Sequence, residues 1–152
     1  MIELAEPVIL DPADYATLPS VDSLDALANK RGKQDVTFTS VGYGLQAAQL
    51  NNPTPQAHTV GVRVRMFSTP KLDQINAPGF TGDYSMLLSN NTKTGGTCFG
   101  DSGGPTFDNT NSLLLVAVTS FGYSPNCTGV GGAYRVDQPD DLEFLAEFGI
   151  TP

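Results

Sequence analysis

Residues 98–105, Cys-Phe-Gly-Asp-Ser-Gly-Gly-Pro, surround one serine with three glycines. Glycine lets the backbone turn sharply and approach a bound group closely, so Ser102 is expected to expose its hydroxyl group. Two backbone N–H groups near such a serine could stabilise an oxyanion. The alternative is an ordinary glycine-rich β-turn with an exposed serine, but the segment favours the functional interpretation.

The composition around this segment indicates a mostly β domain. The 152 residues are enough for one domain with a hydrophobic core. The 16 glycines and 11 prolines are typical of many turns and short strands rather than long helices. Alternating or apolar runs predict strands at residues 36–41, 59–67, 84–88, 105–107, 113–119 and 132–136. Within 59–67, Val64 and Met66 fall on one face and Arg65 on the other.

The end of the chain predicts a helix. Residues 140–148 combine an apolar face with Asp140 or Asp141 as the N-terminal cap. A short helical turn is expected around residues 23–30. About six short antiparallel strands with a terminal helix predict a closed β-barrel.

The charge balance excludes an electrostatic nucleic-acid binder. Sixteen acidic residues against eight basic ones give a formal net charge of −8, and a phosphate-binding surface needs clustered cations. Lys30, Arg31 and Lys33 lie close together, but acidic stretches surround them. No run of about twenty apolar residues predicts a membrane-spanning helix. The first residues lack the basic and apolar regions of a signal peptide.

The two cysteines favour a disulfide. Cys98 and Cys127 cannot supply the four ligands of a zinc site, even with His58 added. A single disulfide is the better interpretation, and it indicates an oxidising compartment. Neither a metal nor another cofactor is implied.

The serine segment resembles the active-site loop of trypsin- and chymotrypsin-like serine peptidases, whose Gly-Asp-Ser-Gly-Gly-Pro signature is complete at residues 100–105. Cys98 and Cys127 match a cysteine pair that this family bonds. Further similarity follows in chain order, at residues 36–44, at 120–122, where Ser-Phe-Gly resembles Ser-Trp-Gly, at 131–136, and at the terminal helix.

The resemblance implies a fold and a division of the chain. The expected fold is all-β, a six-stranded antiparallel β-barrel that is the second barrel of the two-barrel trypsin-like fold, with a C-terminal α-helix. Residues 35–152 would form this barrel. Residues 1–34 would be the inter-barrel linker and a remnant of the first barrel. The resemblance also implies an extracytoplasmic or secreted protein.

The resemblance assigns roles in a serine-type endopeptidase. Ser102 would be the nucleophile, and the N–H groups of Gly100 and Ser102 would form the oxyanion hole. In this family, the acid matching Asp101 is buried and pairs with a new N-terminal ammonium, which orders the loop. The alternative for Asp101 is a turn-stabilising aspartate.

A substrate pocket is expected beside the serine. Gly96 would lie at its floor, where trypsin has an aspartate, so a preference for Lys or Arg is not supported. Gly122 and Gly132 would be small wall positions. Large apolar or aromatic substrate side chains are expected. The full set of pocket residues is Gly96, Thr97, Phe99, Ser120, Phe121, Gly122 and Gly132.

The general base and its orienting acid are not recognisable in the chain. A serine needs a neighbouring base, usually a histidine oriented by a carboxylate. His58 is the sole histidine, and its surroundings match a strand that the family does not use for catalysis. The residues from Met1 to Val8 resemble those that follow the catalytic aspartate of the family. The expectation is therefore a truncated or internally started sequence, inactive alone, which needs the missing N-terminal barrel.

Two alternatives remain. A non-catalytic module could bind peptides or proteins along residues 120–122 by adding a strand to this edge. A structural secreted domain would explain a disulfide but not the six-residue signature. The leading prediction is the peptidase domain acting on protein or peptide substrates.

Overall fold

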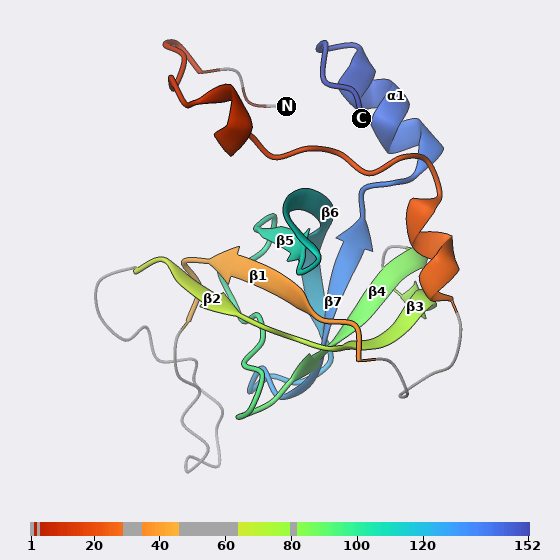
Figure 1. Cartoon of the computed structure of the whole chain (residues 1–152). Helices are drawn as coiled ribbons and strands as arrows, with labels where there is room; N and C mark the ends of the chain where they lie inside the picture. Colours follow the sequence, from red (N-terminus) through yellow and green to blue (C-terminus); the bar gives the residue numbers. More distant parts are fainter. Residues whose placement is uncertain (1, 3, 29–34, 46–63, 80–81) are drawn as a thin grey trace.

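A computed structural model describes residues 2, 4–28, 35–45, 64–79 and 82–152 (Figure 1). The strands are β1 (Phe38–Gly42), β2 (Met66–Ser68), β3 (Leu72–Gly79), β4 (Gly82–Asn90), β5 (Pro105–Asp108), β6 (Asn111–Gly122) and β7 (Gly129–Arg135). The helices are the 3-10 turns η1 (Pro12–Asp14) and η2 (Ser23–Leu27) and the α-helix α1 (Pro139–Ala146). In the described part of the chain, none of these helices has the length and apolar character needed to cross a membrane.

The strands form one antiparallel sheet with the order β2-β1-β5-β6-β7-β4-β3. The end strands β2 and β3 follow each other in the chain, and an isolated bridge joins Thr37 to Lys71. Beside it, the Phe38 N–H donates to the Pro70 oxygen at 3.0 Å, and the Leu72 N–H donates to the Val36 oxygen at 3.0 Å. The sheet therefore curls round toward itself and approximates a barrel, which confirms the predicted mostly β fold with a C-terminal helix.

Within the residues that the structure describes, the sheet has seven strands where six were predicted. The additional strand is β3, which the prediction missed and which follows β2 after an interruption at Thr69 and Pro70. Proline has no N–H to donate to a strand ladder, and Pro70 is fully buried at this break. The interruption thus divides one long edge segment into β2 and β3.

The core lies inside the curled sheet. Its buried residues are Leu24, Phe38, Leu72, Ile75, Met86, Leu88, Val116, Ala117 and Ala133. The face of residues 59–67 predicted to be apolar does not join this core in its described part, because Val64 and Met66 are each about half exposed (51% and 52%). β2 is an end strand of the sheet, and its residues Met66 and Phe67 are exposed.

Helix α1 begins at Pro139, one residue earlier than predicted. Gln138 is its N-terminal cap and Pro139 its first residue, so Asp140 and Asp141 lie inside the first turn and the predicted aspartate cap is wrong. Proline suits this position because its fixed φ is already helical and its missing N–H would have no partner there. Within the described helix, Leu142 is the buried residue.

A buried ion network attaches the segment before β1 to the barrel. The Arg135 guanidinium donates to both oxygens of Asp137, at 2.9 and 2.7 Å, and to Asp25 at 2.7 Å. It also donates to the side chain of Asn76. The Asp137 carboxylate accepts the Leu24 N–H at 2.8 Å. The division at residues 34 and 35 stays a prediction, but η2 packs on the barrel.

The stability of the protein at alkaline pH is expected to depend on Tyr134. Burial, followed by a hydrogen bond to the Asp141 carboxylate, raises the pKa of Tyr134 from 10.0 to about 12. Folding therefore favours the protonated phenol, and this stabilisation is complete below pH 10 and is lost as the pH rises toward about 12. The variant Tyr134→Phe should show a smaller fall in thermal midpoint over this interval. Equal falls in the two proteins would contradict the prediction.

Candidate functional site

The glycine-rich loop between β4 and β5 is a tight turn fixed to the sheet. Gly100 and Gly103 have φ angles of +94° and +79°, which side chains rarely adopt. The Gly103 N–H donates to the Thr119 oxygen at 2.8 Å, and the Thr119 N–H donates to the Gly104 oxygen at 2.9 Å. Gly103 and Gly104 therefore attach the loop to Thr119 of strand β6.

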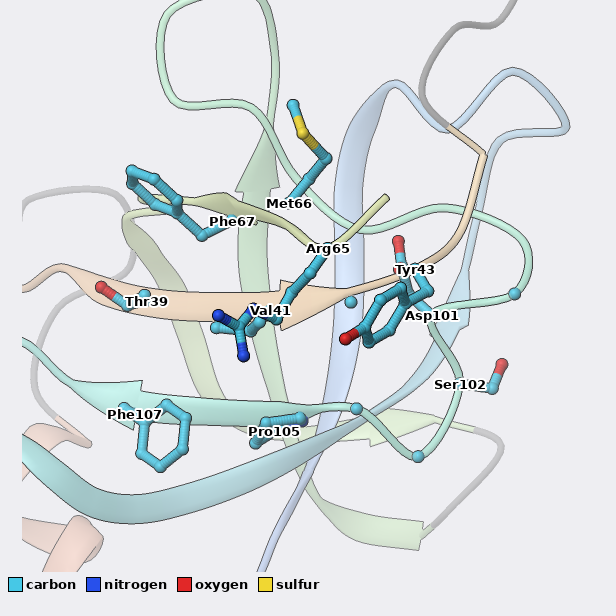
Figure 2. Close-up of a pocket in the computed structure, with 14 residues that line it drawn as sticks. Thr39, Val41, Tyr43, Arg65, Met66, Phe67, Asp101, Ser102, Pro105 and Phe107 are labelled. Carbon is cyan, nitrogen blue, oxygen red and sulfur yellow. The ribbon is translucent and has the colours of Figure 1, made fainter. Parts of the chain in front are cut away.

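Ser102 lies exposed at the outer edge of this loop, and its side chain points away from β1 and β5 (Figure 2). Within the described residues, its hydroxyl group makes no hydrogen bond to another residue. The N–H groups of Gly100 and Ser102 also donate no hydrogen bond in this part of the chain. The hydroxyl and both amides are therefore available to a ligand.

The Asp101 carboxylate accepts hydrogen bonds from two backbone amides. It accepts the Gly44 N–H at 2.7 Å and the Cys98 N–H at 2.8 Å. The carboxylate is partly rather than fully buried. A Cβ added at Gly42 would lie 1.9 Å from an Asp101 oxygen, and one added at Gly44 would lie 2.5 Å from its carboxyl carbon. Gly42, the last residue of β1, and Gly44 just beyond it therefore form a cradle for this carboxylate.

The predicted disulfide is present. Cys98 and Cys127 are bonded, with a Cα–Cα distance of 5.2 Å. The bond joins the glycine-rich loop to the connection between β6 and β7. Both cysteines line the same cavity beside Ser102, so the disulfide fixes two walls of one pocket.

This pocket has a volume of about 190 Å³. It brings together most of the residues predicted to bind substrate: Thr97, Phe99, Ser120, Phe121 and Gly122, with Ser102. Its other lining residues are Asn90, Cys98, Thr119, Ser124, Cys127 and Val130. None of these described lining residues carries a charge, so the pocket is neutral.

Two predicted pocket residues lie elsewhere. Gly96 lines a neighbouring cavity of about 210 Å³ beside Asp101 rather than the pocket next to Ser102. Gly132 lies beneath the ring of Phe121, because a Cβ added there would come within 2.3 Å of that ring. The absence of a side chain at Gly132 therefore makes room for Phe121.

Asn90 and Thr119 also line the pocket, although neither was predicted to do so. Asn90 is 8% exposed and its side-chain N–H donates to the Thr97 oxygen at 2.7 Å. Thr119 is 7% exposed, and its hydroxyl group has no hydrogen-bond partner in the described chain. Their polarity within or beside apolar strand segments was the available signal.

A larger groove of about 960 Å³ lies on the other side of the loop. Figure 2 shows Val41, Tyr43, Arg65, Met66, Phe67 and Phe107 around it, together with the loop from Gly100 to Pro105. Phe67 is 73% exposed. This is an extensive apolar face next to Ser102.

The basic cluster and the histidine are not placed by the structure. Lys30, Arg31, Lys33 and His58 lie outside the described residues. Their predicted roles therefore remain predictions.

The sequence profile of the family described as Trypsin matches residues 11–140. No curated protein matches the chain. The Trypsin match includes the glycine-rich loop, the pocket and the groove.

Solved structures with similar folds include human heparin binding protein (a double mutant), with a TM-score of 0.57 and 21% identity over 90% of this chain and 52% of that one. An inactivated protease paralogue of the scabies mite has a TM-score of 0.59 and 17% identity over 97% and 58%. HL collagenase has a TM-score of 0.52 and 23% identity over 89% and 54%. The chain thus spans 52% to 58% of the length of these structures.

Proposed function

Because this chain belongs to the trypsin family of serine proteases, we propose that it is a serine-type endopeptidase domain with Ser102 as nucleophile. The observation that carries this proposal is the exposed Ser102 hydroxyl beside a neutral pocket and beside the Gly100 and Ser102 N–H groups, which donate no hydrogen bond within the described residues. Protein or peptide chains are the proposed substrates. A secreted location is proposed from the family and fits the disulfide.

The proposed reaction passes through an acyl-enzyme. The Ser102 oxygen attacks the carbonyl carbon of the scissile bond, and a general base takes the serine proton. The Gly100 and Ser102 N–H groups would stabilise the oxyanion, where losing one donor typically raises the barrier by ~2.7–4 kcal/mol. The C–N bond then breaks, the proton passes to the leaving amine, and water hydrolyses the ester.

The general base is proposed to come from a second β-barrel docked at the apolar groove. Two observations support this: the chain spans 52% to 58% of the structures it resembles, and Phe67 in the groove is 73% exposed. Exposed apolar faces of this kind mark interaction sites. The isolated chain is expected to hydrolyse peptides slowly or not at all.

A fluorophosphonate probe tests the nucleophile directly. We expect the chain combined with its complementary barrel to be labelled on Ser102, the isolated chain to be labelled slowly or not at all, and the variant Ser102→Ala to lose labelling completely. The variant Ser112→Ala, which removes another exposed hydroxyl at the start of β6, is the matched control and should keep full labelling. Persistent labelling of Ser102→Ala, or none of the wild-type chain even with the complementary barrel added, would refute the assignment.

A non-catalytic peptide-binding module is the second candidate. The last pair between β5 and β6 is Pro105 with Val118, so β5 does not reach Ser120–Gly122 beyond it. A peptide could add a strand at this edge. Peptide binding that is unchanged in Ser102→Ala, with no probe labelling of the wild-type chain even when the complementary barrel is added, would favour this candidate.

A further inference from the structure

The pocket beside Ser102 contains a buried hydroxyl group, that of Thr119. Thr119 is 7% exposed, lines the pocket, and its Oγ1 atom has no hydrogen-bond partner among the described residues. Leaving such a group unpaired costs free energy, and most buried polar atoms are satisfied. A ligand side chain that hydrogen-bonds Thr119 would recover this cost.

Asn90 lies in the same pocket and closes off the position of Gly96. A Cβ added at Gly96 would lie 2.1 Å from the Asn90 carboxamide carbon and 2.2 Å from its oxygen. The Asn90 side chain therefore fills the space that a residue 96 side chain would need. Its orientation is fixed, because its N–H donates to the Thr97 oxygen at 2.7 Å and it is 8% exposed.

We propose that Asn90 and Thr119 determine the specificity of this pocket, which binds uncharged side chains that end in a hydrogen-bonding group, such as a carboxamide. The inference rests on the proposed function, because it treats the pocket beside Ser102 as the one that receives a substrate side chain. In this proposal Asn90, and not Gly96 as the sequence predicted, determines which side chains the pocket binds.

The neutrality of the pocket supports this choice of ligand. Its described lining residues carry no charge, and a buried ion without a partner costs far more than a hydrogen-bonded neutral group. The Phe99 and Phe121 rings and Val130 give apolar walls. A flat neutral group with a polar tip therefore fits better than a cation or an anion.

Three ligands of almost the same shape test the proposal: neutral benzamide, cationic benzamidinium and anionic benzoate. We expect wild-type chain to bind benzamide most tightly in NMR titrations, with shifts at Thr97, Thr119 and Gly122. The variant Thr119→Val keeps the side-chain shape and should weaken benzamide about two- to tenfold, the value of one hydrogen bond. The variant Asn90→Asp should strengthen benzamidinium about ten- to a hundredfold, as a charged acceptor would.

Asn91→Asp is the matched control, because it adds the same charge at the adjacent, exposed position. It should leave all three affinities near those of the wild type. Tighter benzamidinium than benzamide binding by the wild type would overturn the proposal, as would an unchanged ligand ranking in folded Asn90→Asp. If Asn90→Asp does not fold, Thr119→Val decides: weaker benzamide binding supports the proposal, and unchanged binding overturns it.

Failure of the proposed function gives a different result. Benzamide binding at Thr119 without fluorophosphonate labelling, even with the complementary barrel added, would reject Ser102 as a nucleophile and keep the pocket preference. Labelling of Ser102 together with preferred benzamidinium binding would keep Ser102 as the nucleophile and reject the proposed pocket preference.

Discussion

Replacing Arg135 with leucine is expected to lower the free energy of unfolding by about 3–5 kcal/mol, the usual cost of breaking a buried ion pair from one side. Arg135 is 1% exposed and Asp137 is 0% exposed. Without the guanidinium, the Asp137 carboxylate would remain buried with the Leu24 N–H at 2.8 Å and the Gln138 side-chain N–H at 3.2 Å. Chemical denaturation of the purified variant measures the loss.

Two further variants separate charge burial from the loss of a side chain. The double variant Arg135→Leu with Asp137→Asn removes both charges and should recover much of the stability. Lys71→Ala breaks the exposed pair with Asp35, which is 3.3 Å long, and should cost much less. If Arg135→Leu is no less stable than Lys71→Ala, the network is not the anchor described above.

Acid should weaken the same network. The hydrogen bond from Arg135, and then that from Asn76, hold the pKa of Asp25 below its ordinary value of 3.8. The stabilisation is therefore present above this ordinary value and is lost as the pH falls through the lowered one. On acidification, the free energy of unfolding should fall less in Arg135→Leu than in the wild type.

Replacing Gly44 with alanine is expected to disorder the loop around Ser102 and destabilise the protein by about 1–3 kcal/mol. The added Cβ would lie within 2.5–2.7 Å of three carboxyl atoms of Asp101. The carboxylate can swing away only by breaking its hydrogen bonds from the Gly44 and Cys98 N–H groups, at 2.7 and 2.8 Å. Slower fluorophosphonate labelling should accompany the loss of stability.

The matched control is Gly122→Ala, because a Cβ there would meet nothing within 4 Å. Its stability should stay close to that of the wild type. In a chain that already carries Asp101→Ala, the Gly44→Ala change should cost little, since the clash is then removed. An equal cost with and without Asp101 would show that the cradle does not act through this carboxylate.

Much of the fold was predictable because local patterns and global packing agree. The alternation over residues 36–41 predicted β1, whose Phe38 and Ser40 face inward. β3 was missed because its sequence, Leu-Asp-Gln-Ile-Asn-Ala-Pro-Gly, does not alternate and contains a proline. Its pairing with β4 has register shifts, and Asn76 has a φ of +53°. Irregular strands of this kind are specified by their neighbours rather than by their own pattern.

The site was predictable where its residues are close in the chain. Ser102, the disulfide partner Cys98 and the glycines of the loop were all recognised from one short segment. The contact between Asp101 and Gly44 joins two residues that are far apart in the chain. The Asn90 side chain folds back onto the loop and fills the space beside Gly96. Residue spacing cannot show which side chain fills a cavity, so Asn90 and Thr119 appear only in the three-dimensional arrangement.

The segment before β1 has a consequence for a nicked protein. Thr17 pairs with strand β6 through two backbone hydrogen bonds, of 2.8 and 2.9 Å, while Leu24 enters the core and Asp25 bonds Arg135. A single peptide-bond cut between residues 28 and 35 would leave all of these contacts intact. The two fragments should therefore migrate together on a sizing column and separate only in denaturant, as a non-covalent complex.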